Sequence, residues 1–525
     1  MIKMKTLNYH KKFRTIALAL AATLIVSGCS SGSDDTAANS SQLVIADNEP
    51  PQTFDPIQAG NSTVNAVVIP LYDTLIDFDA QNELGPRLAE SYKTSQDGMK
   101  IEITLRAGVK FHDGSLLTSK DVQYTMDRVK ALNVGVASEV VAYKSTDVID
   151  DLNLTINLSE PSAPFLSALS RIYILNSNLV KANLGSDSGQ TWLASNDAGS
   201  GPYTLVSYTT NQEVVFKKFP DYYRGFDGQA ENVVIKYLTE SATQRDALLN
   251  GDVDIAYDVA TADLPGFEGN SEYAVTKKDT LVQLYIFFNT QKGETKDPRV
   301  REAIRLAYDY QSHVTSILAG NGSVAEGPLP SVMNCHVGIA AGKQDLEKAK
   351  KLLAAAGKSN LKLTMSYLSV IEEMDRSGTL LQSALREIGV DLTLKTVTFP
   401  EYMEQVSKVA TTPDMGMIYA FPSYPDPHSV LAINFDSKYI GGGYNYAAYK
   451  NPKVDSLVRA AAVETDSKKR CDLYGQAQNI IEGDFVSINI SNPKFVVVSR
   501  TGISGDIYRP AHHNTLDIYN TKVGS

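Results

Sequence analysis

Apolar residues in this chain of 525 residues recur with the two-residue period of strands in several places. Over residues 100–106, three aliphatic side chains stand two positions apart, which is typical of a strand with one buried face. Near-continuous apolar stretches at 284–288 and 495–498 predict strands that are buried on both faces. These segments indicate at least one sheet inside the protein.

Other segments follow the longer period of a helix. Behind Asp297 and a proline, apolar residues recur every three or four positions, which predicts a helix that begins there. A second helix is expected from about Asp345, and a third before Gly389, followed by a strand over 390–397. Helices and strands in this order predict an α/β fold whose sheets are covered by helices, in more than one lobe.

The beginning of the chain has the features of an export signal. Five basic residues and no acidic one fall within residues 1–28, and a short apolar run follows at 16–26. The ending Val-Ser-Gly-Cys resembles the bacterial lipobox, which predicts a lipoprotein signal peptide over 1–28 and lipidation of Cys29. The alternative is ordinary cleavage, with Cys29 as a bystander. Residues 29–42 are polar and predict a flexible tether, and no later run is long enough to span a membrane.

The charge balance limits the partners of the chain. The formal net charge is -11 even with the basic first segment included, so the rest of the chain is more acidic still. An acidic body argues against nucleic acid and against an anionic membrane surface as partners. The length predicts two to four folding units of ordinary globular composition.

Cys335 and Cys471 are the cysteines that remain after Cys29. In an oxidising compartment they could pair, or each could be a buried small side chain. Their separation in the sequence does not decide between these alternatives.

Motifs for catalysis or for a cofactor are missing. The sequence has no His-Glu-x-x-His, no Cys-x-x-Cys and no phosphate loop, and the Gly-rich stretch 185–189 has Asp187 where a nucleophilic serine would stand. The seven histidines are scattered, and the adjacent His512 and His513 would point to different sides of a strand. The sequence therefore favours binding over catalysis, and no cofactor or metal is expected.

A series of motifs in fixed order resembles one protein family. The segments strongly resemble those of family 5 of the extracellular solute-binding proteins, the peptide/nickel-type receptors of ABC importers. They lie at residues 84–92, 106–122, 199–203, 220–225, 247–255, 288–290, 297–303 and 327–330. The resemblance extends from about residue 43 to the end of the chain.

The resemblance implies a bilobed fold of the periplasmic-binding-protein type (class II, cluster C), with an extra domain inserted in the first lobe. The expected parts are a first lobe of 43–80, 199–286 and 492–525, an extra domain of 81–198 and a second lobe of 287–491. Two lobes that close on a ligand exclude water and strengthen each polar contact.

The family also implies the partners and the location of the protein. It would capture a small solute, such as an oligopeptide or another polar metabolite, and deliver it to an ABC permease whose ATPase subunits hydrolyse ATP. It would be exported and anchored to the cell membrane by its lipid, on the periplasmic or extracellular face. A surface enzyme or a chaperone-like lipoprotein that has reused the fold is the rival from a different class.

The ligand is less clear, because residues 420–428 depart from the pattern of peptide receptors. There, an Asp pairs with the α-ammonium group of the peptide; Ser423 takes its place here, and Ala420 replaces a Trp. Leu368 falls near the position of the Arg that binds the carboxylate in dipeptide receptors. A neutral serine cannot supply the charge that a buried ammonium needs.

Three ligand classes remain open: a peptide or modified peptide, an opine, sugar or other polar metabolite, and nickel or a nickel chelate. The metal alternative depends on His428, which is a weak signal alone. The candidate ligand contacts are Ser423, Tyr424, Asp426, Asn445 and Tyr446.

Overall fold

The computed structural model describes residues 42–368, 371–441, 443–512 and 515–524. The predicted signal peptide, Cys29 and nearly all of the predicted tether lie outside these residues. Residues 40–525 form a compact unit by themselves. None of the helices in the described ranges combines the length and the apolar character needed to cross a bilayer.

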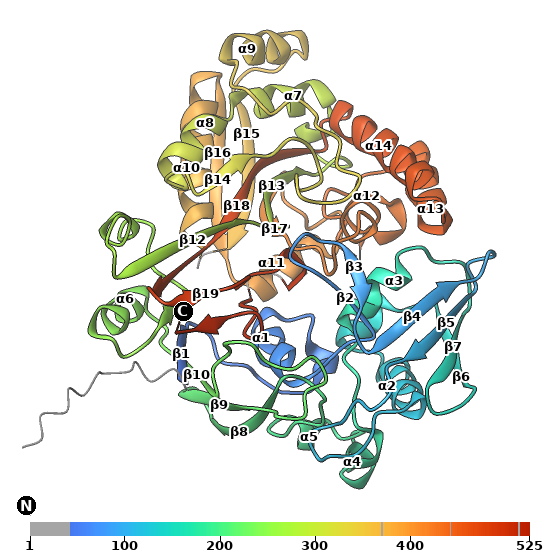
Figure 1. The fold of residues 1–525 in the computed structure, drawn as a ribbon. Helices are drawn as coiled ribbons and strands as arrows, with labels where there is room; N and C mark the ends of the chain where they lie inside the picture. Colours follow the sequence, from blue (N-terminus) through green and yellow to red (C-terminus); the bar gives the residue numbers. More distant parts are fainter. Residues whose placement is uncertain (1–41, 369–370, 442, 513–514, 525) are drawn as a thin grey trace, which may run out of the picture. The chain divides into compact units, whose positions relative to one another are not determined.

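The largest sheet has twelve strands and consists of two halves (Figure 1). The strands of the first half are β1 (Gln42–Asp47), β8 (Tyr203–Thr209), β9 (Glu213–Lys218), β10 (Asn232–Tyr237), β11 (Ile255–Ala256) and β12 (Tyr273–Asp279). The strands of the second half are β13 (Gln283–Phe288), β14 (Gly322–Val324), β15 (Leu361–Leu368), β16 (Val390–Val397) and β17 (Met415–Ala420). Every residue of β13 is buried, as its apolar sequence predicts.

One long strand, β18 (Ser487–Arg500), belongs to both halves. Its first part, up to Pro493, pairs with β13 and β14, and its last part, from Lys494, pairs with β12 and β11. Figure 1 shows β18 passing from one group of strands to the other. The predicted strand at 495–498 is therefore confirmed as part of a longer one.

A separate sheet of four strands lies next to the first half. Its order is β4 (Ala89–Thr94), β5 (Lys100–Leu105), β7 (Asn153–Leu158) and β6 (Tyr143–Val148), with helix α2 (Ser119–Leu132) against β6. In β5, Ile101, Ile103 and Leu105 are buried as the alternation predicts. They share one hydrophobic cluster with Leu43 and Ile45 of β1, so the small sheet and the first half have a common core. We call this combined part the first lobe, and the second half with its helices the second lobe.

Short elements complete the first lobe. They are the strand pairs β2 (Ile76–Phe78) with β3 (Leu84–Pro86) and β19 (Ile503–Ser504) with β20 (Lys522–Val523), and the helices α1 (Ser62–Leu71), α3 (Phe165–Ala168), α4 (Ser177–Ala182), α5 (Gln190–Leu193) and α6 (Ser241–Asn250).

Two helices of the second lobe begin where the sequence predicts. The Asp297 side chain accepts a hydrogen bond from the Arg299 amide at 2.9 Å and caps α7. Asp345 likewise accepts from the Lys348 amide at 2.8 Å and caps α9. The helices are α7 (Pro298–Ala307), α8 (Tyr310–Ser312), α9 (Leu346–Ala355), α10 (Glu372–Glu387), α11 (Phe399–Val406), α12 (Ile433–Phe435), α13 (Pro452–Val463) and α14 (Ser467–Gly483).

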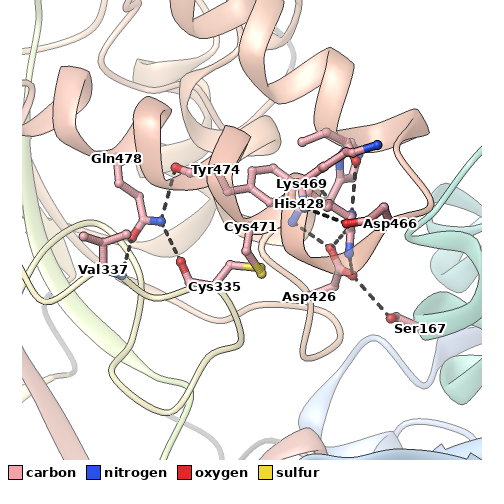
Figure 2. Close-up of a disulfide and its surroundings, with 12 residues drawn as sticks. Ser167, Cys335, Val337, Asp426, His428, Asp466, Lys469, Cys471, Tyr474 and Gln478 are labelled. Atoms are coloured by element: carbon pink, nitrogen blue, oxygen red, sulfur yellow. Dashed lines mark hydrogen bonds and ion pairs between the residues drawn. A yellow bond between two sulfur atoms is a disulfide. The ribbon is translucent and has the colours of Figure 1, made fainter.

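A disulfide joins Cys335 to Cys471 on α14, which answers the question that their spacing left open (Figure 2). About two turns further along α14, the buried Gln478 donates to the Cys335 carbonyl at 2.8 Å and accepts from the Val337 amide at 3.2 Å. The disulfide and this amide side chain together fix the segment around Cys335 to the helix.

Two of the expected boundaries between the lobes fall inside strands. The boundary at 286/287 cuts β13, which pairs with β17 along its whole length and so lies in the second lobe. The boundary at 491/492 falls within β18, which both lobes share. The other domain limits stay predictions.

Candidate functional site

A cavity of about 730 Å³ lies between the two lobes. The first lobe contributes Gly60, Asn61 and Ser62, and the second lobe contributes the remainder of the wall. The volume is in the range of pockets that hold small molecules.

The first-lobe wall is the beginning of α1. Asn61 caps this helix, because its side-chain oxygen accepts a hydrogen bond from the Thr63 amide at 2.9 Å. The chain of α1 thus starts at the cavity, with the amide end of the helix toward it, where the helix dipole is positive.

The second-lobe wall is built around the ends of two parallel strands. Strand β15 ends at Leu368 and β17 ends at Ala420, and both residues line the cavity. The carboxyl ends of parallel strands are the usual place for a ligand in open α/β sheets. The loop after β17 continues the wall with Phe421, Pro422 and Ser423.

The cavity wall is aromatic, aliphatic and polar, and none of its residues in the described part of the chain is charged. Aromatic side chains come from six positions, and hydroxyl and amide groups are interspersed among them. The aromatic residues are Tyr285, Phe399, Tyr419, Phe421, Tyr444 and Tyr446. Such a wall can pack against apolar groups and can form hydrogen bonds with a few polar ones.

Two of the five candidate contacts, Ser423 and Tyr446, line this cavity. The Ser423 hydroxyl forms a hydrogen bond with Glu139, at the end of a short 3₁₀ helix of the first lobe (Gly135–Glu139). Burial raises the pKa of Glu139, and this hydrogen bond opposes the shift. The ring of Tyr446 lies 5.7 Å from that of Phe287.

Two other candidates, Tyr424 and Asp426, are not among the cavity residues. The Tyr424 ring is buried in the hydrophobic cluster of the first lobe. Arg470 of α14 holds the Asp426 carboxylate through two hydrogen bonds, and Ser167 of the first lobe adds one at 3.4 Å (Figure 2). Burial opposes ionisation of Asp426, but Arg470 and the His428 amide together lower the pKa of this carboxyl.

Asn445 also lies away from the cavity, and its side chain holds its own loop. Its amide nitrogen donates to the carbonyls of Asp436 and Tyr449 at 3.1 and 3.0 Å, and its oxygen accepts from the Tyr449 amide at 2.9 Å. With all of its polar groups occupied, Asn445 has a structural role in this arrangement.

His428 is half-buried beside Asp426 and is not among the residues of the cavity wall. Its Nδ1 atom has no hydrogen-bond partner among the described residues, and burial lowers the pKa of the imidazole to about 4. Within the described residues, no three His, Cys, Asp or Glu side chains gather in a way that could hold a metal ion.

The lobes also touch beside the cavity. The Ala163 amide donates to the Ala462 carbonyl at 2.8 Å. Tyr424 packs in the hydrophobic cluster of the first lobe, and Asp426 accepts a hydrogen bond from Ser167 of that lobe. The segment 424–426 therefore connects the lobes, while Ser423 just before it lines the cavity.

Comparison with known proteins identifies the family. The family model described as bacterial extracellular solute-binding proteins, family 5, matches residues 83–442. The chain belongs to this family. Its members are solute-binding proteins, and the bilobed α/β fold expected from the sequence is confirmed by solved relatives.

Among the relatives of this family 5 protein is the probable D,D-dipeptide-binding periplasmic protein DdpA of Escherichia coli. It is 28% identical over 484 residues, which cover 91% of this chain and 93% of the relative. The di/tripeptide-binding protein 4 of Pseudomonas aeruginosa is 27% identical and covers 98% of this chain and 99% of its own. The structure of DppA from Helicobacter pylori, in complex with the peptide STSA, has a TM-score of 0.77 at 23% identity, over 92% of this chain and 98% of that one.

Several cavity residues of the family 5 protein escaped the sequence analysis. The motifs point to the loop after β17, but the start of α1 and the end of β15 are far from it in sequence. Leu368 was marked only by its position near the carboxylate-binding Arg of dipeptide receptors, because no strand was predicted over 361–368. No signal in the sequence marked Gly60, Asn61 or Tyr419.

Proposed function

We propose that this protein is the substrate-binding receptor of an ABC importer and that it captures a short peptide or a peptide-like solute between its lobes. The observation that carries the proposal is the cavity between α1 and the ends of β15 and β17, with its mixed aromatic and polar wall. A ligand there would touch both lobes at once, so its binding would favour the closed arrangement that a permease can recognise.

The names of the relatives support a peptide ligand, and the neutral wall limits what kind of peptide fits. Ser423, in the cavity wall, cannot pair with an ammonium group as a carboxylate would. An opine, a sugar or a nickel chelate is the second candidate, and the neutral wall is the observation that favours it. We also propose that the lipid on Cys29 holds the receptor at the cell membrane, next to its permease and ATPase.

Native mass spectrometry of residues 30–525, purified without refolding, tests the ligand. Closed receptors release their cargo slowly, so a bound ligand is expected to survive purification. A set of peptide masses would support the proposal. A single small metabolite or a metal complex would replace the peptide by the second candidate.

The anchor has a test of its own. Cells that express the full chain are labelled with radioactive palmitate, and the Cys29→Ser variant is compared with the wild-type protein. Label in the wild type that is lost in the variant supports lipidation, whereas equal amounts would contradict it.

A further inference from the structure

A carboxyl group lies directly behind one part of the cavity wall. Glu373 is the second residue of α10, and its neighbours Ile371 and Met374 both line the cavity. Tyr419 of β17 also lines it, and its hydroxyl donates a hydrogen bond to Oε2 of Glu373. The carboxyl group therefore accepts a hydrogen bond from a residue of the cavity wall.

No basic side chain of lysine or arginine pairs with Glu373 in the part of the chain that the structure describes. Its Oε1 atom is buried, accepts no hydrogen bond from any residue that the structure describes, and lies 3.3 Å from Nε2 of His313. That imidazole also has hydroxyl groups near both ring nitrogens: Tyr308 at 2.9 Å and Ser491 at 3.1 Å. Among the described residues, the Glu373 carboxylate thus has no lysine or arginine partner, and the imidazole of His313 is its basic neighbour.

The direction of the hydrogen bond determines what Tyr419 can offer to a ligand. Burial, and after it the charge of Glu373, raise the pKa of Tyr419 well above its usual range, so the phenol keeps its proton. That proton is donated to Glu373, and the lone pairs of the Tyr419 oxygen remain for a donor. The carboxylate behind it polarises this oxygen and strengthens the bond that it accepts.

The second carboxyl near the cavity differs in its surroundings. Glu139, behind Ser423, feels the positive charge of the buried Arg171, which favours the ionised form of Glu139. The two charges offset one another in the field that they create in the cavity. The side of Tyr419 is therefore the more negative one.

We propose that Tyr419, backed by Glu373, binds a protonated amine of the ligand, and that Glu373 determines the specificity for such ligands. A protonated amine carries only donors and a positive charge, and in a closed cavity it needs both an acceptor and a nearby negative charge. The inference rests on the proposed function. It places the negative charge that the amine needs at Glu373, and not at position 423, where this chain has a serine.

The test compares the binding of two peptide mixtures to residues 30–525. The protein is first freed of ligand by partial unfolding and refolding. One mixture contains apolar di-, tri- and tetrapeptides with free amino termini, and the other contains the same peptides after N-acetylation. Binding is measured by calorimetry for the wild type, for Glu373→Gln and for Tyr419→Phe. Glu372→Gln is the matched control, because it removes the same charge from the same turn of α10, where the side chain is 84% exposed.

We expect the wild type to bind the free peptides at least tenfold more tightly than the acetylated ones. Glu373→Gln and Tyr419→Phe should each weaken binding of the free peptides by about ten- to hundredfold, which is the scale of a charge-assisted hydrogen bond. Binding of the acetylated peptides, the melting temperature of Tyr419→Phe and all results for Glu372→Gln should change little.

The outcomes separate the two proposals. If both mixtures bind equally well, or if both variants bind the free peptides like the wild type, the amine site is refuted while the peptide receptor stands. If neither mixture binds and native mass spectrometry detects no peptide, the peptide receptor is refuted, and the amine site falls with it.

Discussion

The Arg470 guanidinium donates two parallel hydrogen bonds to the Asp426 carboxylate, from Nη1 to Oδ2 at 2.8 Å and from Nη2 to Oδ1 at 2.6 Å. The pair joins α14 to the loop after β17, three residues beyond Ser423. Paired bonds of this kind fix orientation as well as distance. The carboxylate thus positions the loop that enters the cavity wall.

Removal of the arginine should destabilise the protein. In Arg470→Met the Asp426 carboxylate, only 5% exposed, loses its charge partner. The free energy of unfolding, measured with urea, should fall by about 3–5 kcal/mol, as for other broken buried pairs. Lys468→Met, which breaks a largely exposed pair with Asp472 on the same helix, should change it little. Equal effects of the two substitutions would contradict a buried pair.

The disulfide should contribute to stability through the length of chain that it closes. Cys335 and Cys471 are 136 residues apart, so the bond restricts the unfolded chain considerably. The double variant Cys335→Ser/Cys471→Ser should lose about 2–5 kcal/mol of unfolding free energy in a urea titration. A reducing agent should lower the melting temperature of the wild type but not that of the variant; an equal response would argue against the bond.

His428 should make the folded protein sensitive to mild acid. Burial lowers its pKa from 6.5 to about 4, so the imidazole stays neutral in the folded state between these values while it takes up a proton in the unfolded state. The free energy of unfolding of the wild type, relative to that of His428→Gln, should therefore be constant above pH 6.5 and decline as the pH falls toward 4. Chemical denaturation of both proteins at pH 7.5, 5.5 and 4.5 checks this. A difference that does not vary with pH would show that the imidazole titrates normally.

Tyr444 should matter for the ligand more than for the fold. It lines the cavity, yet 55% of the residue is exposed, so truncation costs little packing within the protein. Tyr444→Ala should weaken binding of the co-purified ligand about tenfold, because the ligand loses an apolar contact. The fraction of protein that carries ligand in native mass spectra should fall, with an unchanged melting temperature of the ligand-free protein. An unchanged fraction would place the ligand elsewhere.

Local patterns in the sequence were sufficient for individual elements. The helix starts at Asp297 and Asp345 and the alternation in β5 depend on residues that are neighbours in the chain, and each is confirmed. The limits of the lobes were harder to predict, because β13 and β18 take their places from pairing with distant strands.

The site was predictable only where a motif lies on the cavity wall. Ser423 and Tyr446 line the cavity, whereas Asp426 and Asn445 are close to them in sequence and point into the protein. A motif locates a loop, but it does not determine which polar side chains of the loop form hydrogen bonds within the protein and which line the cavity. Tyr419 and its partner Glu373 are 46 positions apart, and only the folded chain brings them together.

The two lobes share the backbone of β18, and this has a consequence for any attempt to produce them separately. To separate the lobes, the chain would have to be cut near Pro493 and also between β12 and β13, and each lobe would keep a shortened β18 and strands that had lost part of their pairing. Unpaired strand edges of this kind invite association with other chains. We therefore expect lobes separated in this way to aggregate when expressed alone, and to become soluble only when both are made in the same cell and the strand is restored across the break.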